Sequence, residues 1–510
     1  MRRMLTSDEA AHWLREQRVR HLAVDSRRVQ PGDAFVAWPG GERDGRQFVP
    51  DSLTAGAIAC LMDAHGAAAW GYEDNRVAVL DNLKHWGGDV AAQFYGQPSR
   101  RLRTVAVTGT NGKTSTAWWC AQWLSALGTP SALIGTLGAG VPGGELESTG
   151  FTTPDPITLQ RLLARSVEQA HKAVVLEASS IGIDEGRING LQLHTAVFTN
   201  LSQDHLDYHG SMEAYWAAKR ALFDWPGVRV AVVNTDDVHG EQLAAELRGR
   251  SASVALWTVS SQPAHPLHRQ AVLQATQAVW ADHGVTFQVV HRPTGQSVSL
   301  TAPVVGDYNV NNLLCALAVV CSGGVSLADA AAALSALSAV PGRMEAAWPQ
   351  APAGLPLVLV DYAHTPDAVE QALRALQPLA HHRGGRLWCV LGCGGDRDRA
   401  KRPLMAAAAE REAARLVLTS DNPRSEDPLQ ILHDMQAGLT EPVRALVEPD
   451  RREAIRAAIW QADTRDVVLI AGKGHETYQE MAGERRPFSD VTEGRNALQQ
   501  RPSTSTGGQP

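Results

Sequence analysis

The fold is decided by the stretch Leu102-Arg103-Thr104-Val105-Ala106-Val107-Thr108-Gly109-Thr110-Asn111-Gly112-Lys113-Thr114. Residues 102–107 form a largely apolar run typical of a buried strand, and the pattern of residues 114–127 predicts a helix. The small residues between them let backbone N–H groups approach phosphate groups at the positive end of that helix. The stretch therefore predicts a phosphate-binding loop in an α/β fold.

This loop is a variant of the standard pattern G-x-x-x-x-G-K-[ST]. Gly112 is in place, but Val107 stands where the first glycine is expected, so Gly109 must make the early turn. The lysine can neutralise the β- and γ-phosphates of ATP, and the threonine hydroxyl can ligate Mg²⁺. A plain glycine turn is the alternative, but the order of strand, loop, Lys-Thr pair and helix disfavours it. We therefore predict that ATP contacts Gly109, Thr110, Asn111, Gly112, Lys113, Thr114 and Ser115.

Composition narrows the class of protein. The 510 residues are too many for one hydrophobic core, and the 44% apolar and 20% charged residues are those of a globular protein. The net charge of -7 gives no sign of the overall positive charge that is typical of nucleic-acid-binding proteins. No apolar run approaches the roughly 18 residues of a membrane span, and no apolar segment follows the N-terminal arginines. We expect a cytoplasmic monomer that is not inserted in a membrane.

The cysteines predict no metal site. None of the six forms a C-x-x-C pair. Cys389 and Cys393 could be half of a metal site, but they lie where an apolar strand passes into a loop. Reduced, buried thiols are the better interpretation.

Strands that alternate with helices predict an α/β protein of three domains, with a mainly parallel central sheet and a doubly wound, Rossmann-like C-terminal domain. The expected domains are 1–98, 99–340 and 341–498, followed by a disordered tail, 499–510. In such sheets ligands bind where the strands end, so the polar residues after each strand are candidates. The expected strands are 173–177, 195–199, 229–234, 357–360, 387–391, 416–419 and 467–470.

The loop TGTNGKT resembles that of the Mur ligases and the folylpolyglutamate synthetases, which join an amine to a carboxylate with ATP. The resemblance extends from about residue 24 to 498 through EASS (177–180), TNLSQDHLDYH (199–209), GDYNVNN (306–312), GRME (342–345), DYAHTP (361–366) and DNPR (421–424). Among the Mur ligases, it points to those that complete a UDP-N-acetylmuramoyl-tripeptide. It implies ATP-dependent addition of meso-2,6-diaminopimelate to the D-glutamate of UDP-N-acetylmuramoyl-L-alanyl-D-glutamate, in peptidoglycan precursor synthesis. The reaction would pass through an acyl phosphate, because phosphorylation gives the carboxylate a good leaving group.

The resemblance implies a catalytic group of Lys113, Glu177, His205 and Lys219. Its implied Mg²⁺ ligands are Thr114, Glu177, His205 and Lys219, the last as a CO₂-derived carbamate (N6-carboxylysine). From local pattern alone, Glu177 could be a helix N-terminal carboxylate, His205 a structural histidine and Lys219 a solvated helix lysine. A carbamate needs a neutral amine, so the surroundings of Lys219 should lower its pKa.

The resemblance assigns the uridine end of the nucleotide-sugar substrate to the first domain. The implied contacts are Ser26, Gly41, Glu42, Arg43, Thr152, Thr153, Ser179, Glu185 and Arg187. Residue types in the loop at 41–43 depart from some relatives, so backbone contacts are expected there. Glu185 would need a neighbouring donor to lie beside an anionic substrate.

Three further ATP contacts are implied outside the phosphate loop. Asn309 lies at a helix start, where helix capping is the alternative. Arg343 follows Pro341-Gly342 at the second domain boundary, and Asp361 ends an expected strand. We expect them at the adenine, phosphate or ribose of the nucleotide.

The third domain should select the incoming amine. Diaminopimelate carries a carboxylate that L-lysine lacks, and a planar arginine can bind a carboxylate with two hydrogen bonds. The implied contacts are Arg397, Asp421, Asn422, Pro423, Arg424, Gly472 and Glu476. A proline turn with a surface arginine is the local alternative for DNPR. L-lysine as the amine, a non-catalytic scaffold and a plain nucleotide hydrolase are the rival functions, and the intact Lys113, Glu177 and Lys219 disfavour the scaffold.

Overall fold

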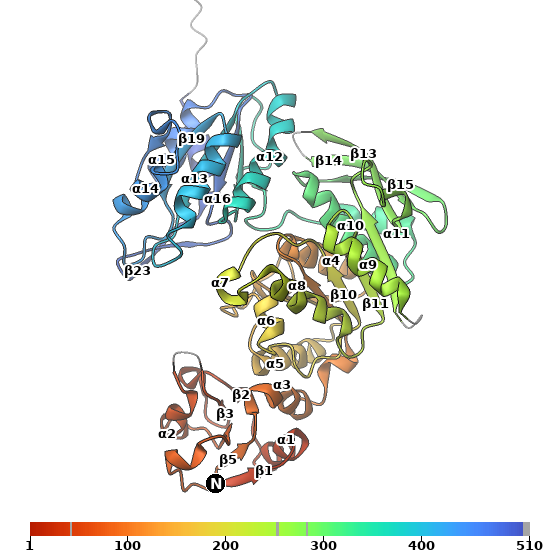
Figure 1. Ribbon diagram of the computed structural model, residues 1–510, viewed down its shortest axis with the longest axis vertical. Helices are drawn as coiled ribbons and strands as arrows, with labels where there is room; N and C mark the ends of the chain where they lie inside the picture. The colour runs from red at the N-terminus through yellow and green to blue at the C-terminus, as the bar shows by residue number, and fades with distance from the viewer. Residues whose placement is uncertain (41–42, 251–253, 282–283, 503–510) are drawn as a thin grey trace, which may run out of the picture. The chain divides into compact units, whose positions relative to one another are not determined.

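The computed structural model describes residues 1–40, 43–250, 254–281 and 284–502 (Figure 1). They divide into two compact units. Unit 1 contains Met1–Ser260, Ala264–Leu273 and Leu313–Ala336, and unit 2 contains Ser261–Pro263, Gln274–Asn312 and the chain from Leu337 onward.

The N-terminal part of unit 1 is a five-stranded parallel sheet in the order β1-β5-β4-β3-β2. Its elements are β1 (Arg2–Met4), β2 (Leu22–Ala23), β3 (Ala34–Ala37), β4 (Ala59–Asp63), β5 (Val77–Leu80), α1 (Ser7–Glu16), α2 (Val49–Thr54) and α3 (Leu83–Phe94). Successive residues of β3 alternate between two cores: Val36 packs with Leu14 in one, and Phe35 packs with Val49 in the other. The sheet is therefore buried on both faces.

The central part of unit 1 is built on the sheet that carries the phosphate loop. Neighbouring strands run in the order β12-β11-β10-β6-β9-β7-β8, and all are parallel except β8. The strands are β6 (Arg103–Thr108), β7 (Ser131–Gly135), β8 (Gly138–Gly140), β9 (Ala173–Glu177), β10 (Thr195–Phe198), β11 (Val230–Asn234) and β12 (Ala255–Ser260). The helices are α4 (Lys113–Ala126), α5 (Pro156–Glu168), α6 (Ser180–Asp184), α7 (Leu206–His209), α8 (Met212–Arg220), α9 (Val238–Gly249) and α11 (Leu327–Ala332).

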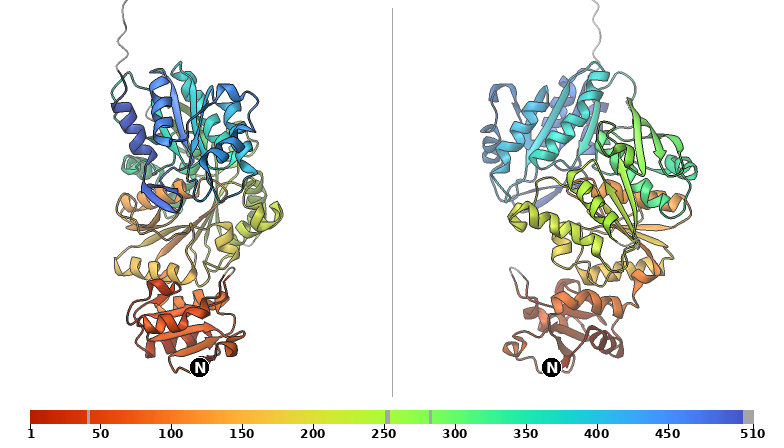
Figure 2. Two further views of the ribbon diagram at one scale, coloured as in Figure 1. Left: turned by 90° about the vertical axis from the view of Figure 1, so that its left-hand side faces the viewer. Right: turned by 45° about the vertical axis from the view of Figure 1, so that its right-hand side comes forward.

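Unit 2 contains a doubly wound sheet, coloured cyan to blue in Figure 2. Its strand order is β16-β17-β21-β18-β19-β20, and only β16 is antiparallel. The strands are β16 (Glu345–Ala346), β17 (Leu357–Asp361), β18 (Leu387–Cys393), β19 (Arg415–Ser420), β20 (Leu446–Val447) and β21 (Val467–Ala471). The helices α12 (Pro366–His382), α13 (Lys401–Glu412) and α14 (Pro428–Gln436) cover one face, and α15 (Arg451–Gln461) and α16 (Asp490–Gln499) cover the other. Alternate strand residues enter the two cores, as with Leu359 and Val358.

Unit 2 also contains two antiparallel hairpins and the start of a helix. The pairs are β14 (Gly284–His291) with β15 (Gln296–Ala302), and β22 (Tyr478–Met481) with β23 (Glu484–Pro487). β13 (Leu273–Ala281) precedes β14, and α10 spans Asp307–Cys321.

The α/β fold class is confirmed, and each strand expected from the sequence is present with ends shifted by at most two residues. The expected tail begins too early, because α16 includes Gln499, and the Arg501 side chain donates a hydrogen bond to the Ala462 carbonyl. The rest of the expected tail, 503–510, lies outside the described residues. All six cysteines are buried and free. In the described part of the chain, no helix combines the length and apolar character that crossing a membrane requires.

Candidate active site

The phosphate loop follows β6 directly, and only glycine fits its first turn. Gly109 has φ 149°, and a Cβ atom there would lie 1.9 Å from Thr199 Oγ1. Gly112 has φ 83° and precedes the first residue of α4. Asn111 N–H donates to Asn200 Oδ1 at 2.9 Å, and Thr199 Oγ1 donates to the Asn111 carbonyl at 2.6 Å. The residues after β10 therefore fix the loop.

The lysine of this loop is turned onto the loop itself. Lys113 Nζ donates to the carbonyl oxygens of Gly109 and Thr110 at 2.9 and 2.8 Å. The positive charge therefore lies at the strand end of the loop, where it offsets carbonyl dipoles.

Glu177 ends the neighbouring strand β9 and is 1% exposed. Its Oε2 accepts hydrogen bonds from Thr114 Oγ1 at 2.9 Å and from Thr136 Oγ1 at 3.1 Å. Its Oε1 accepts from the Thr136 N–H at 2.8 Å. A carboxylate and a hydroxyl oxygen are the hard ligands that Mg²⁺ prefers, so this pair fits the ion.

Lys219 comes to the same loop from helix α8. Its side chain is 1% exposed, and its Nζ donates to the Gly109 carbonyl at 2.8 Å. Burial, together with the charge of Lys113, lowers the pKa of Lys219 well below that of a solvated lysine. The expectation of a solvated helix lysine from local pattern is therefore wrong. A neutral amine at this position is the form that can react with CO₂.

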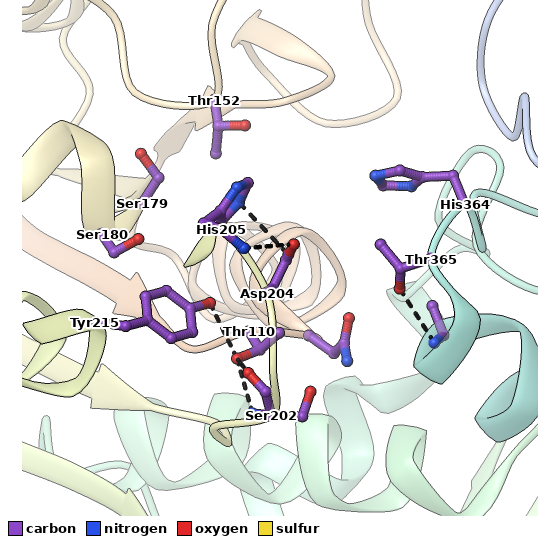
Figure 3. Close-up of polar contacts among 12 residues, drawn as sticks. Thr110, Thr152, Ser179, Ser180, Ser202, Asp204, His205, Tyr215, His364 and Thr365 are labelled. Carbon is purple, nitrogen blue, oxygen red and sulfur yellow. Dashed lines mark hydrogen bonds and ion pairs between the residues drawn. The ribbon is translucent and has the colours of Figure 1, made fainter. Parts of the chain in front are cut away.

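Tyr215 is a site residue that sequence reasoning missed. It is fully buried, and its hydroxyl lies 3.1 Å from Thr110 Oγ1 (Figure 3). That threonine also bonds both the N–H and the carbonyl of Ser202, at 2.9 and 3.1 Å. Lys219 Nζ lies 4.3 Å from the centre of the Tyr215 ring, a cation–π distance. The available signal was the spacing of four between the two residues, which puts them on one helix face.

His205 is more exposed than the other expected metal ligands. Its backbone has φ 51°, its side chain is 46% exposed, and its Nε2 lies 3.4 Å from an Asp204 carboxylate oxygen (Figure 3). Its ring centre is 6.2 Å from that of Tyr215. The described residues contain no group of three or more His, Cys, Asp or Glu side chains placed to hold a metal. The structure therefore brings Thr114 and Glu177 into contact, while the remaining two ligands stay predictions.

Several residues expected at the nucleotide-sugar substrate gather beside Glu177. Thr153 Oγ1 donates to the Glu177 carbonyl at 2.8 Å and accepts from the Ser179 N–H at 2.9 Å. Thr152 Oγ1 lies 3.1 Å from Thr136 Oγ1. These hydroxyl groups form a row around Glu177, from Thr114 in the phosphate loop to Ser179 at the start of α6.

Arg187 contacts the same group of residues through Thr153. It donates to the Thr153 carbonyl at 3.1 Å and pairs with Glu185 at 2.6 Å, which supplies the donor that Glu185 was expected to need. Its guanidinium lies 4.6 Å from the centre of the exposed Phe151 ring.

Of the contacts expected at the uridine end, Ser26 begins a 3-10 helix (Ser26–Arg28), and the backbone carbonyl of Arg43 accepts a hydrogen bond from the Gly40 N–H. The expected contacts Gly41 and Glu42 lie outside the described residues.

In unit 2, Asn309 is nearly fully buried and bonded within its own helix start. Its Nδ2 donates to the Val305 carbonyl at 2.7 Å, and its Oδ1 accepts from Asn312 at 3.1 Å. Neither bond is a helix cap, in which a side-chain oxygen accepts from a backbone N–H of the first turn, and Asn309 lies inside α10 rather than before it.

Arg343 and Asp361 lie near each other in unit 2. Arg343 stacks over the Tyr362 ring at 4.8 Å, and the Met344 N–H donates to Asp361 Oδ2 at 2.8 Å. Burial raises the pKa of Asp361, and the charge of Arg343 opposes that rise. Burial, with Arg343 nearby, also lowers the pKa of His475 to about 4.

Two residues expected at the amino-acid substrate contact each other although 54 positions separate them. Asn422 follows β19, Glu476 follows β21, and Asn422 Nδ2 donates to Glu476 Oε2 at 2.8 Å. Gly472 has φ 114°, and a Cβ atom there would lie 2.7 Å from Asp421 Oδ2. Glycine is therefore required where Asp421 approaches the end of β21.

The two arginines expected at the substrate carboxylate both approach Gly394. A Cβ atom on Gly394 would lie 3.0 Å from Arg424 Nη1 and 3.7 Å from Arg397 Cγ. Arg424 has φ 53° and donates to the Gly395 carbonyl at 2.7 Å, so its guanidinium is held in place rather than free on the surface. Arg397 is exposed.

Comparison with known proteins decides the family. Residues 107–320 match the Mur ligase middle domain, and residues 342–474 match the Mur ligase glutamate ligase domain. The UDP-N-acetylmuramoyl-L-alanyl-D-glutamate--2,6-diaminopimelate ligase of Acidovorax sp. (strain JS42) is 50% identical over 505 residues, 98% of each chain. The chain belongs to the Mur ligase family.

Other proteins similar to this Mur ligase agree with that assignment. A protein of the same name from Chromobacterium violaceum is 48% identical, with 94% of each chain covered. A solved structure of a ligase with that name has a TM-score of 0.65 and 37% identity, and covers 94% of this chain and 95% of its own. MurF from Acinetobacter baumannii, at 18% identity, 91% and 95% coverage and a TM-score of 0.63, shares the fold.

Proposed function

We propose that this Mur ligase adds meso-2,6-diaminopimelate to the D-glutamate of UDP-N-acetylmuramoyl-L-alanyl-D-glutamate, with hydrolysis of ATP. The observation that carries the proposal is the gathering of Thr114, Glu177 and Lys219 at one phosphate loop. Relatives that bear the name of this activity cover nearly the whole chain.

The reaction requires two anions, a substrate carboxylate and the γ-phosphate, to approach each other. Positive groups fixed before the reaction lower the free energy of that approach. Lys113 would exchange the carbonyls of Gly109 and Thr110 for the phosphates of ATP, since an ammonium binds phosphate oxygens more strongly than neutral carbonyls. Mg²⁺, when bound at Thr114, Glu177, His205 and a carbamate on Lys219, would offset phosphate charge. The substrate carboxylate would attack the γ-phosphorus of ATP, which forms the acyl phosphate and releases ADP. The incoming amine would then attack the acyl carbon, which forms the amide and releases phosphate and a proton.

We assign the rest of ATP to unit 2 residues. Arg343 has a guanidinium suited to phosphate or ribose oxygens, and Asp361 has a carboxylate suited to ribose hydroxyls. Asn309 would have to give up its bond to the Val305 carbonyl to contact the nucleotide with its Nδ2. Of the remaining loop contacts, Gly112 and Ser115 would use backbone N–H groups, whereas the Asn111 N–H would first have to leave Asn200 Oδ1.

The nucleotide-sugar substrate is assigned to unit 1. Thr152, Thr153, Ser179 and Arg187 offer hydroxyl and guanidinium donors within one bonded group. Ser26 and Arg43 would contact the uridine diphosphate. We propose domains at 1–98, 99–340 and 341–498 and a monomeric enzyme in the cytoplasm.

Diaminopimelate is favoured over L-lysine as the amine by Arg424. Its guanidinium is held by the Gly395 carbonyl and can bind a carboxylate that L-lysine lacks. Asp421, Asn422, Pro423, Gly472 and Glu476 would surround the distal amino-acid centre, with Arg397 at its edge.

The test is phosphate release from ATP by the purified protein with the muramoyl dipeptide and one amine at a time. We expect release to require both substrates and to be faster with meso-diaminopimelate than with L-lysine. Faster reaction with L-lysine would contradict the assigned amine. Release without any amine would indicate a nucleotide hydrolase, and no release under any condition would indicate a scaffold.

A further inference from the structure

Lys473 is a fully buried lysine at the end of the C-terminal sheet. It lies two residues after β21, and its side chain is 0% exposed. Nζ donates to Asn422 Oδ1 and to Glu476 Oε2, each at 2.9 Å. Because a buried charge is costly unless paired, this cation depends on those two partners.

The three side chains form a closed ring of hydrogen bonds. Asn422 donates to Glu476 Oε2 at 2.8 Å, so that single oxygen accepts from both the amide and the ammonium. Asn422 Oδ1 also accepts from the Glu480 N–H at 2.9 Å. Both ring bonds to Glu476 end on Oε2, so two donors from different parts of the chain hold this oxygen in place.

A second buried ion pair supports the strands that carry this ring. Arg451 and Asp490 are both 0% exposed and pair at 2.7 Å. Arg451 also donates to the carbonyls of Ser420 and Ala471, the last residues of β19 and β21. This ion pair, which is neutral overall, thus holds the ends of the two strands that precede Asn422 and Lys473.

Lys473 therefore affects the charge that Glu476 presents. An ammonium 2.9 Å from a carboxylate offsets its charge, and this effect is stronger in a buried site than in water. The distal centre of diaminopimelate has an ammonium and a carboxylate and is neutral overall, whereas the end of L-lysine has an ammonium alone. A site with one more negative charge would attract the lysine end and repel the extra carboxylate.

We propose that Lys473 is a positioning residue that sets the choice of amine, by holding Glu476 in one orientation and offsetting its charge. The inference rests on the proposed function, because it concerns the amino-acid site of that reaction. Asn422 and Glu476 were expected contacts, but Lys473 was not among them. Its role is to make the site accept a neutral distal centre in preference to a cationic one.

The experiment measures kcat/KM for meso-diaminopimelate and for L-lysine, and KM for ATP, in the full-length protein and in Lys473→Met. We expect the ratio of kcat/KM for diaminopimelate to that for lysine to fall by about tenfold or more, mainly through KM for the amine. KM for ATP should change by less than about twofold, since Lys473 has no part in the phosphate loop. An unchanged ratio in a folded variant would overturn the proposal.

The matched control is Arg456→Met. Arg456 also pairs with a glutamate three positions away, Glu453, but the pair is on the surface. The same loss of charge there should leave the ratio unchanged, and an equal fall would show that total charge, not Lys473, decides the preference.

The double variant Lys473→Met/Glu476→Gln keeps the proposal testable if the single variant does not fold. Both charges are removed, so no buried charge is left without a partner. We expect lower kcat/KM with both amines and a ratio close to that of the unchanged protein. A ratio that falls about tenfold in this charge-balanced variant would overturn the proposal. If the unchanged protein uses neither amine, the proposed function fails instead.

Discussion

Lys113 and Lys219 donate hydrogen bonds to the same acceptor, the carbonyl oxygen of Gly109, at 2.9 and 2.8 Å. Two ammonium groups on one oxygen repel each other, which favours the neutral form of the more buried one. The charge of Lys113 is accordingly a cause of the lowered pKa of Lys219, second to burial. The charge of Lys113 thus favours the neutral amine of Lys219, which is the form that the proposed carbamate requires.

Lys219→Arg should abolish carbamate formation while keeping a positive charge. We expect activity to fall about a hundredfold or more, the size of effect seen when a charged group at a reaction centre is lost. The lowered pKa should allow the carbamate to form closer to neutral pH than on a solvated lysine. Carbon NMR with labelled bicarbonate should detect the carbamate in the unchanged protein and not in the variant. A carbamate signal of equal strength in the variant would place the modification elsewhere.

Glu177→Gln should weaken Mg²⁺ binding. The carboxylate accepts bonds on both oxygens, and an amide would turn an N–H group toward one of those donors. We expect the half-saturating Mg²⁺ concentration to rise about tenfold or more and the free energy of unfolding to fall by about 1–3 kcal/mol. The control is Glu213→Gln on the exposed side of α8, for which both should stay unchanged. Unaltered Mg²⁺ dependence in the Glu177 variant would remove it from the metal site.

Gly109→Ala tests the loop geometry. Its Cβ would lie 1.9 Å from Thr199 Oγ1, so the loop must move away from the residues that hold it. KM for ATP should rise by about tenfold or more, because the backbone N–H groups no longer converge on the phosphates. Gly128→Ala is the matched control: Gly128 also has positive φ, but no atom lies within 4 Å of its Cβ position. That control should lose about 1 kcal/mol of stability and keep its KM for ATP.

Much of this arrangement could be predicted because the parallel strands are buried on both faces. Such strands have continuous apolar runs, as in Ala173–Glu177, and the polar residue at their end marks the site. The strands β13 to β15 gave no such signal. β13 is exposed along much of its length, as at Val279, and antiparallel pairing leaves a weaker pattern.

Local sequence could not predict the contacts that Tyr215 and Lys473 make with residues far away in the chain. Lys473 depends on Asn422, 51 positions earlier, and Tyr215 depends on Thr110, 105 positions earlier. These contacts form only when the sheet places the ends of its strands together. Glu185 and Arg187 are only two positions apart, yet their pairing follows from the turn after α6, which the sequence pattern did not define.

His475→Asn should change how stability depends on pH. The pKa of His475 is about 4 in the folded protein, and 6.5 is the ordinary value for histidine. Between these values the unfolded chain binds more protons than the folded one, so stability falls as pH falls from 6.5 to 4. The loss should reach up to about 3 kcal/mol and be absent in the variant, as measured by denaturant unfolding at several pH values. His381→Asn, at an exposed position of α12, should behave like the unchanged protein.

Arg424→Lys separates recognition of the amine from binding of the nucleotide. Arginine can give a carboxylate two parallel hydrogen bonds, whereas lysine offers a single point charge. We expect kcat/KM for meso-diaminopimelate to fall about 10- to 100-fold, because one charged hydrogen bond is worth about 1.5–3 kcal/mol. KM for ATP and the reaction with L-lysine should change by about twofold at most, since L-lysine has no second carboxylate. Arg452→Lys, an exposed arginine paired with Glu493, is the control and should leave all three values unchanged. Equal losses with diaminopimelate, L-lysine and ATP would mean that Arg424 only stabilises the loop after β19 through its bond to the Gly395 carbonyl.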